Sequence, residues 1–351
     1  MAELPVIHLD PMGTDHHGEA ARMRELGPVV RVILPGDVAV YAVTSHELVA
    51  QLVTNPLVSK DWRNWSKIRS GEVGDSWPLI GMIKVTNMVT SDGDTHLRLR
   101  RPVTRTFTRG RVEDLRPRLE SNVSALLDAL PSHAAADGVV DLRPHFAYPV
   151  PMQMICELFA VPVEWRPRLR ELVDSIFRTN TTAEEVVAVQ KERHETLRRL
   201  VELRRAERGD DLTSALIELG EQGEETLTQE ELVDTIWLFL TAGHETTLSL
   251  IVNGVRALLT NPDQLELART KSMWSEVVEE TLRWDAPIGN FPARYPLADI
   301  EIAGVPIPRG EAILAPYSGV GRDPAQHGPD AGSFDITRAP ERHLAFGGGP
   351  H

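Results

Sequence analysis

The spacing of apolar residues predicts a chain made mostly of helices. A short amphipathic helix is expected at 14–26, where Gly27-Pro28 ends it. From residue 94 onward helical periodicity dominates the sequence. It predicts further helices over 94–108, 111–130, 145–160, 164–178, 183–207, 210–219 and 273–284.

A smaller β portion is predicted at both ends of the chain. The β-branched runs Val29–Leu34 and Val38–Val43 enclose Pro35-Gly36-Asp37, which is typical of a hairpin. Residues 287–316 alternate Pro, Gly and β-branched residues, as short strands do, and residues 321–351 are expected to be mostly irregular. The hairpin is followed by Ser45, a good N-cap for a helix ending before Asn55-Pro56.

The longest predicted element is a central helix over 228–260. Thr228 and Glu231 fit the T-x-x-E capping box, and Asn261-Pro262 ends the helix. The helix is apolar on more than one face, so we expect it in the interior of a large domain. The fold class is therefore mainly α with a small β portion, in one domain spanning 1–351.

The irregular segment 57–91 is rich in Trp, Ile and Met between Gly and Ser. Such a segment is either a binding loop or a loop that packs on the core, and composition favours neither.

Composition and charge exclude several classes of protein. The chain has 351 residues with 51 acidic side chains against 37 basic ones, a net charge of −14, which argues against general nucleic-acid binding. A single cysteine excludes a disulfide framework within the chain and a multi-cysteine metal site. No apolar run reaches the ~18 residues of a membrane span, and the start resembles no signal peptide. We expect a cytoplasmic protein.

One polar constellation interrupts the central helix at Ala242-Gly243-His244-Glu245-Thr246-Thr247. A buried carboxylate is costly without a partner or a task, and the Thr246 hydroxyl could bond the Ala242 carbonyl four residues back. A zinc protease motif is excluded because Leu248 stands where H-E-x-x-H needs its second His. The alternative is a satisfied polar kink without function.

Three further patterns are weak when taken singly. Glu280 and Arg283 lie three residues apart on one helix face, a spacing that any surface helix can show. His96 and Arg100 are two cations at i and i+4, which repel unless an anion lies between them. Residues 346–351 form a glycine-rich segment without the Lys of a phosphate loop.

The order of these motifs resembles one family, the cytochrome P-450 of soluble bacterial haem-thiolate monooxygenases. The resemblance runs from about Asp15 to His351. It rests on five motifs in sequence: His96-x-x-x-Arg100, Ala242-Gly243-x-Glu245-Thr246-Thr247, Glu280-x-x-Arg283, Arg322-Asp323-Pro324 and Phe346-Gly347-x-Gly349-x-His351.

The resemblance implies a role for each motif around a haem b cofactor. Glu245 and Thr246 would be the distal acid–alcohol pair, with Ala242 and Gly243 forming the oxygen groove. Glu280 and Arg283 would form a buried structural ion pair. The haem contacts would be His96, Arg100, Arg294, Phe346, Gly347, Gly349 and His351, and the substrate pocket would include Val85, Met88, Pro287, Ile288 and Phe291.

Two departures from the family pattern matter. The pattern continues past the last His as x-Cys-x-Gly, and this Cys is the iron ligand, so the expected metal ligand lies beyond His351. We interpret the sequence as part of a longer chain; the alternative is an inactive fragment. Cys156, in an apolar helical run, cannot replace the ligand. The second departure is Ser333, where relatives often carry an Arg that joins the Glu280–Arg283 network; Arg338 or His343 could replace it.

The resemblance implies insertion of one oxygen atom of O2 into a C–H bond of a lipophilic molecule of macrolide, steroid or polycycle size. The alternative is a haem-bearing ligand-binding protein without turnover. Electrons would come from a ferredoxin and its reductase. The run from Arg98 to Arg111 contains no acid, so it is either a solvated face or the patch that receives this donor. The patch would comprise Arg98, Arg101, Arg105 and Arg109.

Overall fold

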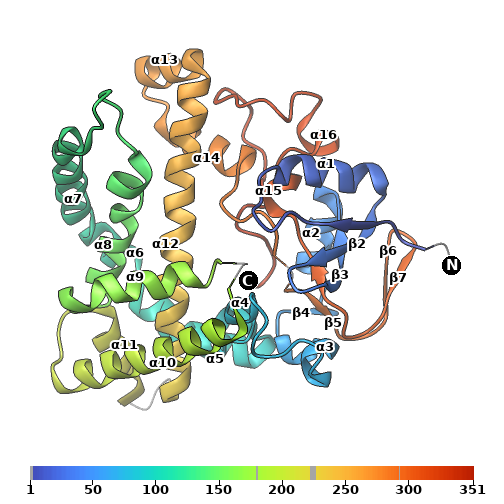
Figure 1. The fold of residues 1–351 in the computed structure, drawn as a ribbon, viewed down its shortest axis with the longest axis horizontal. Helices are drawn as coiled ribbons and strands as arrows, with labels where there is room; N and C mark the ends of the chain where they lie inside the picture. Colours follow the sequence, from blue (N-terminus) through green and yellow to red (C-terminus); the bar gives the residue numbers. More distant parts are fainter. Residues whose placement is uncertain (1–2, 179–180, 222–226, 292) are drawn as a thin grey trace. The chain divides into compact units, whose positions relative to one another are not determined.

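The computed structural model describes residues 3–178, 181–221, 227–291 and 293–351 (Figure 1). The chain divides into two compact units. Unit 1 contains the residues up to Ile83 and those from Asn253 onward, and unit 2 contains Lys84–Val252. The predicted mainly helical class with a small β portion is confirmed.

Unit 1 is built on a four-stranded sheet of order β1-β2-β3-β8. The predicted hairpin is β2 (Val29–Leu34) and β3 (Val38–Val43), antiparallel with Val32 opposite Val40. β1 (Val6–His8) runs parallel to β2, and β8 (Ile313–Leu314) runs parallel to β3. Alternate residues of the hairpin are buried, because one face of the sheet packs on the core.

Two smaller sheets and several helices complete unit 1. β4 (Val58–Ser59) pairs with β5 (Tyr295–Pro296), and β6 (Ile300–Ile302) pairs with β7 (Val305–Ile307). The α-helices are α1 (His16–Leu26), α2 (His46–Thr54), α3 (Ser66–Ser70), α4 (Ile80–Ile83), α13 (Pro262–Lys271), α14 (Trp274–Trp284), α15 (Tyr317–Val320) and α16 (Pro324–His327). The 3-10 helix η1 (Trp62–Asn64) precedes α3.

Unit 2 consists of helices and 3-10 turns. Its elements are η2 (Met88–Thr90), α5 (Gly93–Thr106), α6 (Arg109–Asp114), α7 (Arg116–Ala129), η3 (Leu130–His133), the π-helix η4 (Arg143–Ala147), α8 (Pro149–Leu158), η5 (Val163–Trp165), α9 (Arg166–Ser175), α10 (Ala183–Ala206) and α11 (Leu212–Glu221). Among the described residues, no helix is long and apolar enough to cross a membrane.

The long helix α12 (Gln229–Thr260) contains 32 residues, so it is about 48 Å long. Its predicted capping box is confirmed. The Thr228 hydroxyl accepts from the Glu231 amide at 3.2 Å, and the Glu231 carboxylate accepts from the Thr228 amide at 2.9 Å. Leu232, Val233 and Ile236 are buried, as the apolar pattern required.

One predicted helix is divided in the structure, and two of the elements that the sequence did not predict have a simple explanation. The helix expected over 111–130 is divided at Leu115, because Pro117 occupies the first turn of a new helix, α7. α13 was not predicted, because Asn261-Pro262 is both the stop of α12 and the start of the next helix. β1 was missed because three residues carry too little periodicity.

The segment 57–91 packs in part on the core of unit 1. Trp65 is fully buried, stacks on Tyr295 at a centroid distance of 5.9 Å and meets the edge of Trp77. The Trp77 indole N–H donates to the Pro35 carbonyl at 2.8 Å. For these two tryptophans the core-packing interpretation is therefore correct.

Candidate active site

The polar constellation lies in the part of α12 that belongs to unit 2. The Thr246 hydroxyl donates to the Ala242 carbonyl, as predicted. Ala242 is exposed, whereas Gly243, Glu245 and Thr246 are half-buried. An i−4 hydroxyl bond of this kind competes with the backbone ladder and tends to bend a helix.

Glu245 has a loose environment for a half-buried acid. One of its carboxylate oxygens lies 3.7 Å from the Arg143 guanidinium of η4. Burial raises the pKa of Glu245, Arg143 opposes this effect, and the Asp174 carboxylate adds to it. A carboxyl with a raised pKa beside a hydroxyl can hold and release a proton closer to neutral pH than a free carboxyl can.

His244, one residue earlier, faces the interior of unit 2. It is completely buried, and its ring meets the edge of the Tyr148 ring at a centroid distance of 4.3 Å. Burial lowers the pKa of His244 to about 4, so the imidazole is neutral at pH 7. The Tyr148 hydroxyl donates to Asp174 at 2.8 Å. The sequence did not indicate this cluster, because its members come from the residue before α8, from α9 and from α12.

Gly243 has a packing role beyond the predicted oxygen groove. A Cβ at this position would lie 2.6 Å from Cδ1 of Ile155 in α8. The glycine therefore allows α8 and α12 to approach closely inside unit 2.

His96 and Arg100 share α5, as predicted. His96 is buried, and its Nδ1 donates to the Met88 carbonyl at 2.6 Å. With Nδ1 so used, the ring can donate a second hydrogen bond, from Nε2 to a carboxylate, only as the imidazolium. Arg100 is exposed.

Arg294 in unit 1 is the candidate haem contact with the strongest physical support. It is buried, and its Nη2 donates to the Tyr317 hydroxyl at 3.2 Å. Its Nε and Nη1 are buried and have no hydrogen-bond partner among the described residues. A buried guanidinium with two unused donors is matched by an anionic carboxylate such as a haem propionate. The residues present therefore fit the cofactor that the resemblance implies.

The glycine-rich segment at 346–351 packs against α2. Gly347 and Gly349 have φ of +71° and +77°, which favour glycine. A Cβ on Gly349 would lie 2.4 Å from the Val53 carbonyl oxygen. Phe346 is 78% exposed, while His351 is half-buried.

Glu280 and Arg283 form a buried bidentate pair with N–O distances of 2.6 and 2.7 Å. Arg283 also donates to the carbonyls of Gly321, Ala331 and Ser333. The structure thus identifies the third arm that the sequence left open. The backbone of Ser333 contributes an acceptor, and the Arg338 Nε lies 3.7 Å from Glu280. His343 instead pairs with Glu279.

The predicted pocket and patch residues are distributed over both units. Val85 is buried and Met88 is half-buried in unit 2. Phe291 of unit 1 lies under the Lys60 ammonium at 4.7 Å, and the nearby residues are Pro287 and the exposed Ile288.

In the predicted arginine patch, Arg101, Arg105 and Arg109 are exposed. Arg98 instead forms an ion pair with Glu231, so its charge is largely compensated.

Cys156 behaves as the sequence analysis expected. It is completely buried in α8, where its thiol contacts the Met152 sulfur at 3.7 Å. Burial raises the pKa of this thiol to about 11, so it is not a thiolate at neutral pH.

Comparison with known proteins agrees with this arrangement. The family model "Cytochrome P450" matches residues 24–270 and 272–351. The 2-hydroxy-5-methyl-1-naphthoate 7-hydroxylase of Streptomyces carzinostaticus is 38% identical, over 98% of this chain and 84% of the relative. The cytochrome P450 monooxygenase PikC of Streptomyces venezuelae is 36% identical, over 100% of this chain and 82% of the relative. The solved structure of CYP154C4 from Streptomyces sp. W2061 is 44% identical, with a TM-score of 0.92, covering 100% of this chain and 85% of that structure. The chain therefore belongs to the cytochrome P450 family.

Proposed function

We propose that this haem-iron monooxygenase hydroxylates a lipophilic molecule of macrolide, steroid or polycycle size, and that Glu245 and Thr246 deliver the protons. The observation that carries the proposal is a half-buried carboxyl, 3.7 Å from a guanidinium, followed directly in the sequence by a hydroxyl that bonds back to the Ala242 carbonyl, in the middle of α12. A protein that only binds a ligand needs no such pair, so this observation favours the enzyme over a haem-bearing binding protein.

The haem, when bound, supplies the activation of O2 that no amino-acid side chain can provide. Arg294 would hold one haem carboxylate through the Nε and Nη1 donors that the described residues leave unused. His96 and Arg100, both on α5 of unit 2, would hold a haem carboxylate. His351 and the backbone of Gly347 and Gly349 would contribute from the glycine-rich segment.

Thr246 and Glu245 handle the protons in this proposal. The Thr246 hydroxyl donates its hydrogen to the Ala242 carbonyl, so its oxygen is left to accept a hydrogen bond from a proton donor. Glu245 would exchange a proton with solvent past the exposed Arg143, because burial raises the pKa of its carboxyl. General acid–base help of this kind is typically worth ~10²–10⁴-fold.

The substrate class rests on the apolar side chains assigned to the pocket and on one relative. Val85 and Met88 of unit 2, and Pro287, Ile288 and Phe291 of unit 1, are apolar, and each would offer hydrophobic contact to a lipophilic molecule. The relative from Streptomyces carzinostaticus is named for a naphthoate, a fused-ring aromatic acid. A polycyclic substrate is therefore the first to test.

The proposed electron donor is a ferredoxin with its reductase, which would dock on the exposed Arg101, Arg105 and Arg109. An acidic protein with a local positive patch attracts an acidic partner and speeds its association. This electron transfer would take place in the cytoplasm.

Turnover under isotopically labelled oxygen tests the proposal. The haem-loaded protein, with a ferredoxin and reductase, is given 2-hydroxynaphthoate, a steroid or a macrolide. We expect a hydroxylated product with one atom from oxygen-18 gas and none from labelled water. Saturable binding of such compounds without any product would instead identify a binding protein.

A further inference from the structure

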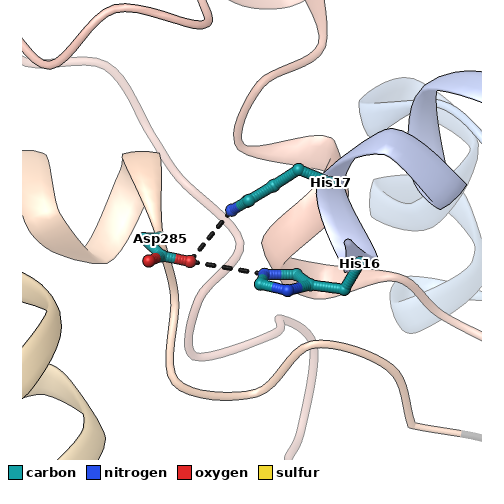
Figure 2. A group of neighbouring side chains, drawn as sticks. All are labelled: His16, His17 and Asp285. Carbon is teal, nitrogen blue, oxygen red and sulfur yellow. Dashed lines mark hydrogen bonds and ion pairs between the residues drawn. The ribbon is translucent and has the colours of Figure 1, made fainter. Parts of the chain in front are cut away.

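A cluster of metal-ligating side chains lies in unit 1 and has no part in the proposed reaction. His16 and His17 begin α1, and Asp285 directly follows α14. Figure 2 shows both imidazoles directed at the same carboxylate oxygen. The two histidines are 268 and more residues away from Asp285 in sequence, so the fold alone brings them together.

The geometry of the cluster matches a tetrahedral ion. The Nε2 atoms of His17 and His16 lie 2.9 and 3.3 Å from Asp285 Oδ1, and the three ligand atoms all lie within 4.8 Å of one another. Zinc bonds to imidazole nitrogen and carboxylate oxygen are about 2.0–2.2 Å long, so tetrahedral ligand atoms are about 3.3–3.6 Å apart. The His16 distance to Asp285 Oδ1 falls at the lower limit of this range, and the His17 distance lies about 0.4 Å below it.

Coordination would place a requirement on the two imidazoles. Their Nε2 atoms face Asp285 Oδ1 and would be the atoms that bind the ion, so each ring would have to carry its hydrogen on Nδ1 instead.

The cluster is also accessible from solvent. His16 and His17 line a surface pocket of about 360 Å³ together with Thr14, Asp15 and Arg256. The side chains of His16, His17 and Asp285 are 32%, 16% and 3% exposed, respectively. An ion can therefore enter from the histidine side and keep a water molecule as its fourth ligand.

Two arginines oppose a cation at this position. Arg256 forms an ion pair with Asp285 Oδ2, and Arg322 lies close enough to depress the pKa of His17. The Arg256 pair leaves Oδ1 for the metal but reduces the negative charge that attracts it. The Asp15 carboxylate in the same pocket offsets part of this repulsion.

We propose that His16, His17 and Asp285 bind one divalent cation such as zinc, with water as the fourth ligand. The ion would join the first turn of α1 to the residue that ends α14 and so stabilise unit 1. The proposal does not depend on the haem or on the oxygenase activity.

Zinc titration of the chelator-treated protein by calorimetry tests the proposal. We expect one saturable equivalent and a higher melting temperature with zinc bound. His16→Ala should weaken binding on the order of 100-fold or more, because losing even an outer partner of a ligand costs about 10–100-fold. This variant should fold, since His16 makes only 3.3 Å contacts and is partly exposed.

Two further variants separate a metal site from a hydrogen-bonded cluster. Arg256→Gln should tighten zinc binding, because it removes a repelling charge, although it also removes an ion pair of the folded protein. The matched control is His133→Ala/His145→Ala, which removes a stacked imidazole pair of unit 2 and should leave zinc affinity unchanged.

X-ray absorption at the zinc edge identifies the ligands directly. We expect two imidazole nitrogens and oxygen ligands at about 2.0–2.2 Å. No saturable equivalent, an unchanged affinity in His16→Ala, or an absorption edge without imidazole would overturn the proposal.

Discussion

Two carboxylate–guanidinium pairs, Glu280–Arg283 in unit 1 and Glu245–Arg143 in unit 2, differ in burial and in distance. In unit 1 the Glu280 and Arg283 side chains are only 5% and 4% exposed, and they meet through two bonds of 2.6 and 2.7 Å. In unit 2 the Glu245 and Arg143 side chains are 24% and 59% exposed, and they lie 3.7 Å apart.

The surroundings of the two pairs explain the difference in role. Arg283 donates to three backbone carbonyls, and Glu280 also accepts from the Asp335 amide at 2.9 Å. Every donor nitrogen of Arg283 and both carboxylate oxygens of Glu280 have a fixed partner, so the pair stabilises the fold. Glu245 has only distant charged neighbours, Arg143 at 3.7 Å and the His244 ring at 3.9 Å, and a raised pKa, so we expect it to change protonation without disturbing the fold.

The largest expected effect is on the buried pair. Glu280→Gln leaves Arg283 buried without its counter-charge, which costs about 3–5 kcal/mol. Urea unfolding should show this loss in the free energy of unfolding. Glu279→Gln, on the same helix but 70% exposed in its ion pair with His343, is the control and should change stability by less than about 1 kcal/mol. Native stability in Glu280→Gln would show that the pair is dispensable.

Thr246→Ala tests whether the hydroxyl beside Glu245 in the sequence takes part in proton delivery. The substitution removes the hydroxyl that bonds the Ala242 carbonyl, so proton delivery should fail while electron uptake continues. We expect product per NAD(P)H to fall on the order of 10²-fold, with a rise in peroxide. Thr246→Ser should restore coupling, and Thr247→Ala, at an exposed neighbour, should leave it intact. Equal coupling in Thr246→Ala and the wild type would remove Thr246 from the reaction.

A smaller, salt-dependent effect is expected at the arginine patch. Arg105→Glu and Arg109→Glu should slow reduction by a ferredoxin about tenfold at low ionic strength. The defect should shrink above ~0.15 M salt, where the screening length is ~8 Å. Arg198→Glu, an exposed site on α10, is the matched control. Turnover driven by peroxide needs no ferredoxin and should be unaffected. If it fell as much as the ferredoxin-driven reaction, the arginine patch would have a structural role instead.

Features that depend on a few neighbouring residues could be predicted from the sequence, whereas contacts between residues far apart in the chain could not. The β2–β3 hairpin and the Ser45 cap of α2 follow from alternation and one hydroxyl, and both are confirmed. The Thr228 capping box needs only four residues, and it is also present. Local hydrogen bonds and turn chemistry are encoded within a few positions.

The features that escaped prediction depend on distant contacts. The unused donors of Arg294 become evident only when Tyr317 and the surrounding core are in place. The close approach of Ile155 to Gly243 joins α8 to α12 and has no local signal. The convergence of His16 and His17 on Asp285 likewise depends on packing between the ends of the chain.

The smallest expected effect is the pH dependence of stability at Glu245. Burial raises the pKa of Glu245 above its ordinary 4.5, so the native state holds this proton more tightly than the unfolded chain does. As pH rises through the raised pKa, the native carboxyl ionises and the wild type loses stability relative to Glu245→Gln. Melting curves from acid to neutral pH should show the variant gaining at most about 1 kcal/mol. A difference of the opposite sign, or one independent of pH, would contradict the assigned pKa direction.

The most direct test of the contrast between a structural pair and a working acid is the coupling ratio of Glu245→Gln, measured beside its melting temperature at neutral pH. The account predicts that product per NAD(P)H falls on the order of 10²-fold while the melting temperature stays at or slightly above that of the wild type. An unchanged coupling ratio, or a loss of stability as large as that of Glu280→Gln, would contradict it.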